Sequence, residues 1–278
     1  MPEGDTIFRT ATSLRNWLGG RRITGATARD PRLGVDRLVG GTLTDVRTHG
    51  KHLFCEFAYP DDGDSLVLRT HMMMTGSWHV YRANDRWRRP ARQVVVSLTA
   101  ADRVAVCFNA PVVELVSKRR SAVLHELGGY GPDILDEPLD IDDIVRRAVR
   151  LAPSTPVGVT LLDQHVVAGI GNIYRCESLF QQRISPFAPM ASVGDDEFSE
   201  LLECAAKLMH ANLSSASVSR VFGATGKIGV YGRTGRPCRV CGTTVQSTKL
   251  GVKPRTVYWC PVCQSGPVGS SGSVPGGG

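Results

Sequence analysis

The sequence contains no run of eighteen or more apolar residues, so we expect no transmembrane helix. It begins MPEGDTIFRT, which lacks the basic segment and apolar stretch of a secretory signal peptide. Aromatic residues are scarce at 6%, yet hydrophobic residues make up 42%, which suffices for a globular core and excludes a largely disordered chain. The expected protein is folded and cytoplasmic, with no membrane partner.

Acidic residues are also in short supply. The chain has 26 Asp and Glu against 33 Lys and Arg, which gives a formal net charge of +7 at pH 7. Residues 226–264 contain seven Lys or Arg and no Asp or Glu. A basic balance favours a polyanionic partner, with nucleic acid first and an anionic membrane second. Charge alone is weak support, because many soluble proteins carry a similar excess.

The eight cysteines fall into two groups. Four are scattered, and four form two CxxC pairs separated by eighteen residues: Cys238, Cys241, Cys260 and Cys263. Each pair lets two thiolates bind one metal ion from a single tight turn. The spacing therefore predicts a four-thiolate zinc site rather than two disulfides or four free thiols. Four thiolates leave no coordination position for water, so we expect one structural Zn²⁺ per chain.

Local sequence patterns change along the chain. Residues 5–18 have the apolar periodicity of a helix. Residues 23–114 consist of short β-prone runs separated by Gly, Asp, Asn and Pro, which is typical of a β-sandwich or barrel. Helical periodicity returns in residues 141–152 and in much of 157–213.

These patterns predict an α+β multidomain protein. It has an N-terminal helix and β-sandwich, then a helical domain, then a β-hairpin (residues 243–258) on the metal site. The expected boundaries are 1–135 for the β-domain, 140–225 for the helical domain, 226–264 for the zinc finger and 265–278 for a flexible tail.

Residues 161–180 contain a candidate anion site. An apolar helix is expected to end near Ala168, and Gly169–Asn172 should turn into a second helix. Glycines there leave the backbone amides at a helix N-terminus open to an anion, and Asn172 adds a side-chain donor. The spacing favours phosphate binding and a simple helix–turn–helix corner about equally, and the GxxxxGK[ST] pattern is absent.

Three motifs together resemble the bacterial formamidopyrimidine-DNA glycosylase/endonuclease VIII family: MPEGDT, GIGNIYRCE and VYGRTGRPCRVC…RTVYWCPVCQ. The resemblance covers residues 1–264 in the right order, and the opening PEGDT is closer to the endonuclease VIII branch. It implies an N-terminal β-sandwich, a helix–two-turns–helix DNA-binding domain and a zinc finger. It also implies a base-excision repair enzyme, both DNA glycosylase and AP lyase, that cuts the strand by β,δ-elimination.

The resemblance assigns catalysis first to Pro2, whose secondary amine becomes the chain terminus when Met1 is removed. An α-amine has a pKa near ~8, so a useful fraction is unprotonated at neutral pH. In the family this amine attacks C1′ of the sugar, expels the damaged base and forms a Schiff base that permits β-elimination. Glu3 matches the family's general acid/base, which protonates the sugar ring oxygen.

Three further residues match family positions. Lys51 corresponds to the lysine that contacts phosphate and donates a proton during β-elimination. Asn172 corresponds to the phosphate-binding asparagine. Arg255, five residues before Cys260, corresponds to the hairpin arginine of phosphate binding and δ-elimination, and its planar guanidinium suits a phosphate. Without the resemblance, Lys51 reads as an ordinary turn lysine.

A flipped-out base leaves a hole in the duplex that a side chain must fill. Residues 69–78, RTHMMMTGSW, match the family's void-filling turn, with Met74 the first candidate and Met73 the second. Three consecutive methionines could belong to the core, but alternation along a strand prevents all three from facing inward. The pattern therefore favours exposure at a loop tip.

The sequence departs from the formamidopyrimidine branch in residues 107–116. This stretch, CFNAPVVELV, lacks the Arg-Phe wedge that probes the opposite base. We therefore favour oxidised pyrimidines in damaged double-stranded DNA as the substrate. Oxidised purines (formamidopyrimidine or 8-oxoguanine) are the alternative lesion, and single-stranded or bubble DNA is the alternative partner. A loop within residues 213–226 is the candidate lesion pocket.

Two other classes of function fit parts of the sequence. One is a non-catalytic homologue that binds damaged DNA, against which the intact Pro2, Glu3 and Lys51 argue. The other is a zinc-ribbon protein that mediates protein contacts. The absence of acidic residues from the basic segment 226–264 argues against it. The expected enzyme is a monomer.

Overall fold

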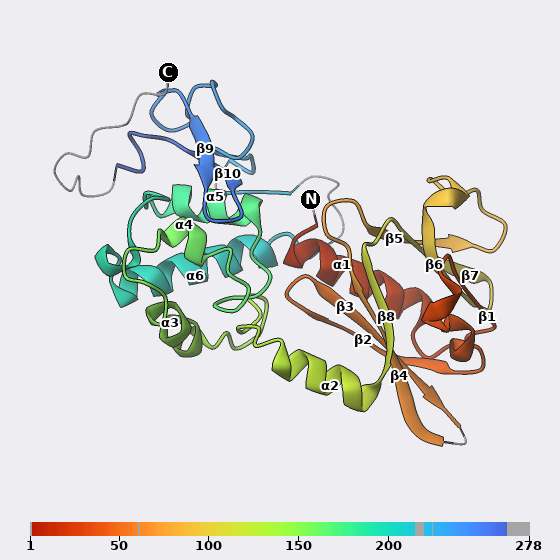
Figure 1. The fold of residues 1–278 in the computed structure, drawn as a ribbon. Coiled ribbons are helices and arrows are strands. Elements are labelled where there is room, and N and C mark those ends of the chain that lie inside the picture. The colour runs from red at the N-terminus through yellow and green to blue at the C-terminus, as the bar shows by residue number, and fades with distance from the viewer. Residues whose placement is uncertain (1, 61, 215–219, 224, 266–278) are drawn as a thin grey trace. The chain divides into compact units, whose positions relative to one another are not determined.

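The computed structural model describes residues 2–60, 62–214, 220–223 and 225–265 (Figure 1). Met1, part of the 213–226 loop and all of the predicted tail except Ser265 lie outside this range. No helix in the described part is long and apolar enough to span a membrane. The chain forms two compact units. The first comprises Met1–Leu139, Val167–Gly169 and Asn212–Ser217, and the second comprises Asp140–Val166, Ile170–Ala211 and Val218–Gly278.

The first unit begins with helix α1 (Gly4–Leu18), as the periodicity of residues 5–18 predicts. Its apolar face packs into the core of this unit and carries Ile7, Ala11, Leu14 and Leu18. Gly19 follows the helix, and a Cβ there would lie 2.4 Å from the carbonyl oxygen of Arg15. Only glycine therefore allows the chain to leave the helix along this path.

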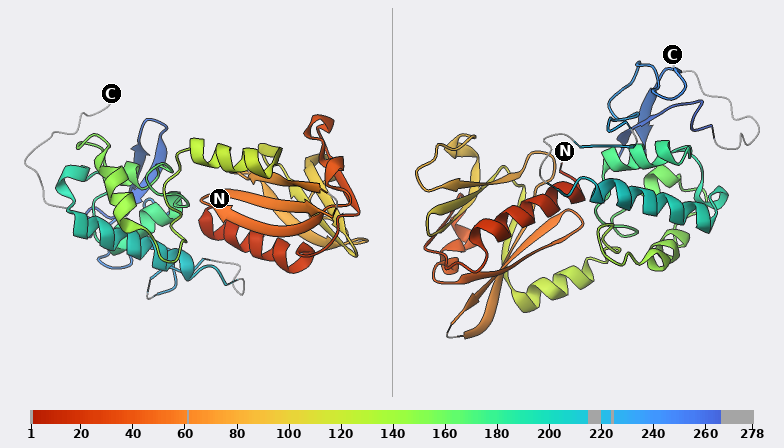
Figure 2. Two further views of the ribbon diagram at one scale, coloured as in Figure 1. Left: turned by 90° about the horizontal axis from the view of Figure 1, so that it is seen from below. Right: turned by 180° about the vertical axis from the view of Figure 1, so that it is seen from behind.

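Eight strands of the described residues form two antiparallel four-stranded sheets in this unit (Figure 2). One sheet has the order β1-β6-β7-β5, with bounds Gly25–Ala28, Val94–Ala100, Arg103–Phe108 and Ser77–Arg82. The other has the order β2-β3-β4-β8, with bounds Thr42–His49, His52–Tyr59, Asp62–His71 and Val112–Ser117. One core cluster takes residues from both sheets, including Leu43, Phe57, Leu68, Leu98 and Ala105. The predicted β-sandwich is confirmed.

Shorter elements complete the connections. The 3-10 helices are Pro31–Leu33, Val35–Leu38, Ala91–Gln93 and Met190–Ser192. Helix α2 (Lys118–Leu127) begins at the basic run KRR, where the sequence patterns did not indicate a helix. Lysine and arginine are good helix formers, so a basic run after a strand can itself begin a helix.

The second unit is helical as predicted. Its helices are α3 (Ile141–Val149), α4 (Val157–Thr160), α5 (Asn172–Gln181) and α6 (Asp195–His210). Asp140 caps α3 by accepting a hydrogen bond from Asp143 N at 2.9 Å. Helix α6 has three acidic residues in its first turn, where the helix dipole favours negative charge.

The expected apolar helix ending near Ala168 is wrong. Only the short α4 forms, and residues 161–169 fold as turns. Asp163 accepts a hydrogen bond from His165 N at 2.9 Å, an interaction that competes with helix formation. Gln164 donates to the backbone carbonyl oxygens of Leu162 and Ile170, at 3.0 and 3.1 Å. Side-chain bonds to the local backbone thus replace the helical ones.

The C-terminal hairpin is confirmed. Strands β9 (Gln246–Leu250) and β10 (Arg255–Trp259) pair antiparallel, with Leu250 opposite Arg255. Gly251 follows β9 with φ +91°, a conformation that glycine adopts without the penalty of a Cβ. Arg255 therefore begins β10 directly after the turn, at the closed end of the hairpin.

Candidate functional site

The start of α1 positions two of the predicted catalytic residues. Glu3 is the N-cap residue, and its carbonyl oxygen accepts hydrogen bonds from Thr6 N at 2.9 Å and Ile7 N at 3.1 Å. The Glu3 side chain is fully buried, whereas Pro2 is half-buried. The helix thus holds a buried carboxyl group beside a proline that keeps part of its surface open.

Asp133, which is 3% exposed, fixes the turn between β2 and β3. Its carboxylate accepts hydrogen bonds from Gly50 N at 2.7 Å and from Leu135 N at 3.1 Å. Gly50 immediately precedes Lys51, which is half-buried. One buried carboxylate therefore determines the backbone path of the predicted phosphate-binding lysine.

Gly169 connects the same region to the N-terminus. Its carbonyl oxygen accepts a hydrogen bond from Gly4 N, next to Glu3, at 3.1 Å. Gly169 has φ +101° and Gly50 has φ +56°, and a Cβ at either position would lie 2.9 Å from a neighbouring side-chain carbon. Both positions require glycine. The segments that carry Glu3 and Lys51 therefore both approach residues 168–169, where the backbones are too close for a side chain at Gly50 or Gly169.

Three aromatic side chains, those of His52 next to Lys51 in the chain, His71 and Tyr130, pack together, a feature that the sequence patterns did not predict. The His52 ring centroid lies 4.5 Å from that of His71 and 5.2 Å from that of Tyr130. Burial lowers the pKa of His71, and the charges of Lys51 and Arg69 lower it further. The THGKH motif at 48–52 could have indicated these rings, because it places a histidine on either side of Lys51.

The tip between β4 and β5 exposes two of the three consecutive methionines. We call Met72–Met74 the methionine tip. Met73 and Met74 are 51% and 56% exposed, whereas Met72 is 2% exposed. Met73 has φ +46°, and its backbone N donates to His71 Nδ1 at 3.1 Å. The expected exposure at a loop tip is observed, and insertion into DNA stays a prediction.

In the second unit, the fully buried Arg175 holds Asn172 against the hairpin. Asn172 Nδ2 donates to the carbonyl oxygen of Thr256 at 2.7 Å, and Arg175 donates to that oxygen at 3.2 Å and to Asn172 Oδ1. Thr256 directly follows Arg255, whose side chain is exposed. The two predicted phosphate contacts, Asn172 and Arg255, therefore lie on elements that are hydrogen-bonded to each other.

Glu177 anchors the chain that leads to the cysteines, a role that the sequence patterns did not reveal. Its carboxylate accepts hydrogen bonds from the backbone N atoms of Gly229, Val230 and Tyr231 at 2.7, 3.0 and 2.8 Å. Burial raises the pKa of Glu177, and these three bonds act in the opposite direction. The GNIYRCE motif thus ends in a residue that holds a distant loop.

The four cysteines of the CxxC pairs converge. The Sγ atoms of Cys238, Cys241, Cys260 and Cys263 all lie within 4.8 Å of one another. The distance is 3.9 Å for Cys238–Cys263 and 3.4 Å for Cys241–Cys260. Sulfurs about 2.3 Å from a tetrahedral ion lie roughly 3.8 Å apart, so these residues could hold a metal ion. The separations are too long for disulfide bonds, which measure about 2.05 Å.

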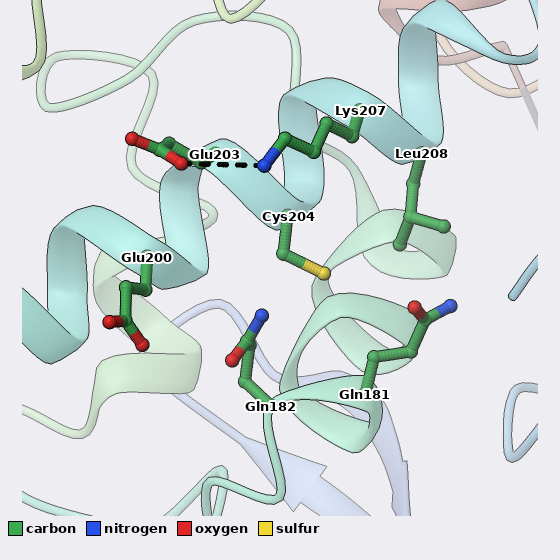
Figure 3. A pocket seen from close by; sticks show the side chains of 7 residues that line it. All are labelled: Gln181, Gln182, Glu200, Glu203, Cys204, Lys207 and Leu208. Carbon is green, nitrogen blue, oxygen red and sulfur yellow. Dashed lines mark hydrogen bonds and ion pairs between the residues drawn. The ribbon is translucent and has the colours of Figure 1, made fainter.

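A cavity of about 340 Å³ lies between α5 and α6 (Figure 3). Its lining residues are Gln181, Gln182, Glu200, Glu203, Cys204, Lys207 and Leu208. An ion pair joins Lys207 and Glu203 at 3.4 Å, and burial raises the pKa of the Cys204 thiol. None of the residues predicted to act on DNA lines this cavity, so we assign it no part in the site.

Comparison with known proteins places the chain in a family. The model of the formamidopyrimidine-DNA glycosylase N-terminal domain matches residues 1–112, and that of the H2TH domain of the same glycosylases matches residues 130–222. The "Probable endonuclease 8 2" of Streptomyces coelicolor is 37% identical, with 99% of this chain and 98% of the relative covered. The chain belongs to the formamidopyrimidine-DNA glycosylase/endonuclease VIII family.

Other members of this family agree in length and fold. The "DNA-(apurinic or apyrimidinic site) lyase Nei2" of Mycolicibacterium smegmatis is 31% identical over 95% of this chain and 99% of its own. A solved complex of Lactococcus lactis Fpg with abasic-site DNA has a TM-score of 0.79 at 22% identity. It covers 95% of this chain and 100% of that one, and shows the shared fold.

We predict that Asp133→Ala lowers the free energy of unfolding of this family member by about 2–3 kcal/mol, because it leaves the buried Gly50 N–H without its charged acceptor. Urea unfolding measures the change. Asp45→Ala, at an exposed position on β2, is the matched control. Equal stabilities of the two variants would show that the Asp133 bonds contribute nothing.

We also predict that stability falls as the pH drops below 6.5, in part through His71. Its pKa in the folded state is lowered, so the unfolded chain takes up the proton first. The His71 contribution is therefore complete above pH 6.5 and is lost as the pH falls towards the folded-state pKa. Urea unfolding at pH 7.5 and 5.5 should show a smaller loss for His71→Asn than for the wild type. His165→Asn, at an exposed site, should match the wild type.

Proposed function

We propose that this chain is a bifunctional DNA glycosylase/AP lyase of base-excision repair. The observation that supports this proposal is the buried Glu3 beside the half-buried Pro2, in a chain that aligns with 98% of a curated relative. Curated relatives are named as endonuclease 8 and as an AP lyase. The bacterial origin of these relatives supports action on chromosomal DNA in a bacterial cytoplasm.

The proposed chemistry begins when Met1 is removed and the Pro2 nitrogen is a free secondary amine. The nitrogen lone pair attacks C1′, the bond from C1′ to the base breaks, and the base leaves with the bonding electrons and takes up the proton that the nitrogen loses. Glu3 protonates the ring oxygen, which opens the sugar and yields an iminium. The iminium acidifies the C2′ proton, so its loss expels the 3′ phosphate and cuts the strand.

The remaining predicted residues would position the DNA. Lys51 contacts phosphate and supplies a proton during β-elimination, and Asn172 and Arg255 hold the phosphates near the flipped nucleotide. The bonds from Asn172 and Arg175 to Thr256 support a shared role, because they couple the position of Asn172 to that of the neighbouring Arg255. Arg255 would also assist δ-elimination. Met74, with Met73 second, would fill the space left by the base.

The four clustered cysteines would hold one Zn²⁺ as tetrahedral thiolates. Bound zinc would act structurally, since it would have no open coordination position. The cysteines flank the β9–β10 hairpin in sequence, so they would fix the backbone around Arg255. All charged residues in 226–264 are basic, which supports a finger that faces DNA rather than a ribbon that binds protein.

The favoured substrate is an oxidised pyrimidine in double-stranded DNA, processed by a monomer. Its support is the short β7–β8 connection, Asn109–Pro111, which has no Arg-Phe pair to probe the opposite base. Oxidised purines, and single-stranded or bubble DNA, remain the alternatives that a substrate panel would separate.

Borohydride should trap the wild type covalently on a duplex with one oxidised pyrimidine. Pro2→Gly, or a chain that keeps Met1, should give no adduct because the secondary amine is absent. Glu3→Gln should slow base excision by about 100-fold or more, as expected for loss of a general acid. Gel mobility measures both, with Pro60→Gly, at an exposed proline, as the control. A wild type that gives no adduct with any damaged base or abasic site would leave only the non-catalytic homologue.

Metal analysis of the purified chain should find about one zinc per chain. A strong chelator should remove it together with duplex binding, because metal binding and folding of such fingers are coupled. Cys260→Ser should lose the zinc, whereas Cys204→Ser should retain it. Full DNA binding by a metal-free chain would contradict a structural zinc.

A further inference from the structure

The connection between β5 and β6 can be followed in Figure 1, and its sequence contains a cluster of arginines that has no part in the site described above. Residues 82–93, RANDRWRRPARQ, contain five arginines and one aspartate. We call Arg86, Arg88, Arg89 and Arg92 the arginine loop. Arg89 is half-buried and the other three are exposed. Within the described residues, none of the four forms an ion pair.

The only acidic residue of this segment is engaged in closing a turn. Asp85 Oδ2 accepts a hydrogen bond from Arg82 N at 2.9 Å, and Asp85 N donates to Arg82 O at 3.0 Å. These bonds involve the Arg82 backbone rather than any guanidinium group. Asp85 therefore forms no ion pair with the arginine loop, and the side chain of Asp102, whose backbone bonds to Ala83, pairs with Arg21 and Arg103 instead.

Apolar packing gives the arginine loop a defined backbone. The Trp87 ring lies 6.4 Å from Tyr81 and 6.2 Å from Phe108, the latter edge-on, within one small hydrophobic cluster. Arg88 N donates to the Tyr81 hydroxyl oxygen at 3.1 Å. Residues 83–91 by themselves line a surface depression of about 890 Å³. The arginines thus belong to an anchored segment that borders a surface depression.

Hydrogen bonds through Asn109 connect the arginine loop to the methionine tip. Asn109 N donates to Gln93 O at 2.9 Å, and Asn109 Nδ2 donates to Gln93 Oε1 at 3.1 Å. Thr75, next to Met74, donates from its hydroxyl to Asn109 O at 3.2 Å. Two hydrogen bonds between Asn109 and Gln93 and one between Thr75 and Asn109 therefore link the end of the loop to the turn predicted to enter the duplex.

We propose that the arginine loop binds the phosphate backbone of duplex DNA beside the lesion, outside the contacts assigned to Asn172 and Arg255. The proposal rests on the proposed function only for the assignment of the methionine tip to DNA. Guanidinium groups pair with phosphate oxygens through two parallel hydrogen bonds. Such contacts carry no base information, so they strengthen binding to damaged and undamaged duplex equally. Continuity with the methionine tip favours DNA over an acidic protein or an anionic membrane.

The test measures affinity for an undamaged 30-base-pair duplex by fluorescence anisotropy at several salt concentrations, using the full chain. Each lost phosphate contact lowers the slope of log affinity against log salt by about 0.9. The Arg86→Gln, Arg88→Gln double variant should therefore lower this slope by about 1–2 and weaken binding roughly 3- to 10-fold. A duplex with an abasic-site analogue should show the same loss.

The Arg37→Gln, Arg150→Gln double variant removes the same charge from two exposed sites outside the loop and is the matched control. Equal slopes for the loop and control variants overturn the proposal. Unchanged DNA binding with lost binding to phosphatidylglycerol vesicles also overturns it, in favour of a membrane. Thermal unfolding of both variants shows whether the fold is retained. Borohydride trapping of the wild type tests the proposed function separately, because the salt dependence needs no catalysis.

Discussion

The hydrogen bond from Gly50 N to the Asp133 carboxylate is the constraint on which the first unit's site depends. It holds a turn against Asp133, 83 residues later in the chain, and Asp133 itself pairs with Ala168 through a parallel bridge. A buried carboxylate is costly unless its oxygens are satisfied, and here backbone N–H groups satisfy it. The hydrogen bond from Gly4 N to Gly169 O then joins the N-terminal residues to the same region.

In the second unit, too, backbone groups satisfy buried charges, and there the charges are of both signs. Arg175 is buried and directs its guanidinium to carbonyl and amide oxygens, while Glu177, two residues later, receives three backbone N–H groups. One turn of α5 therefore organises both the hairpin strand and the chain before it. Because each charge meets backbone groups, the geometry depends on main-chain positions more than on the identity of neighbouring side chains.

Much of this fold could be predicted from the sequence, because its signals are local. Helix α1, the strand-rich region, α6 and the hairpin each follow from periodicity or turn residues within a short window, and the CxxC spacing predicted the cysteine cluster. The stretch before Ala168 was wrongly predicted, because side-chain bonds from Asp163 and Gln164 outweigh its apolar pattern. The roles of Asp133 and Glu177 could not be read, since their partners are distant in sequence. Pro2 and Glu3 were found only through the motifs they accompany.

Met73 adopts a left-handed backbone conformation that costs a non-glycine residue about 1–2 kcal/mol. Two bonds within the protein, from Met73 N to His71 and from Gly76 N to Met72 O at 2.7 Å, hold this conformation. The free-energy cost of this backbone conformation is therefore met when the protein folds. If this turn enters a duplex, little further ordering of the protein opposes entry, and the energetic barrier to insertion rests mainly with the DNA. A base pair that is already weakened would then be opened preferentially by a rigid probe rather than by a loop that adapts to it.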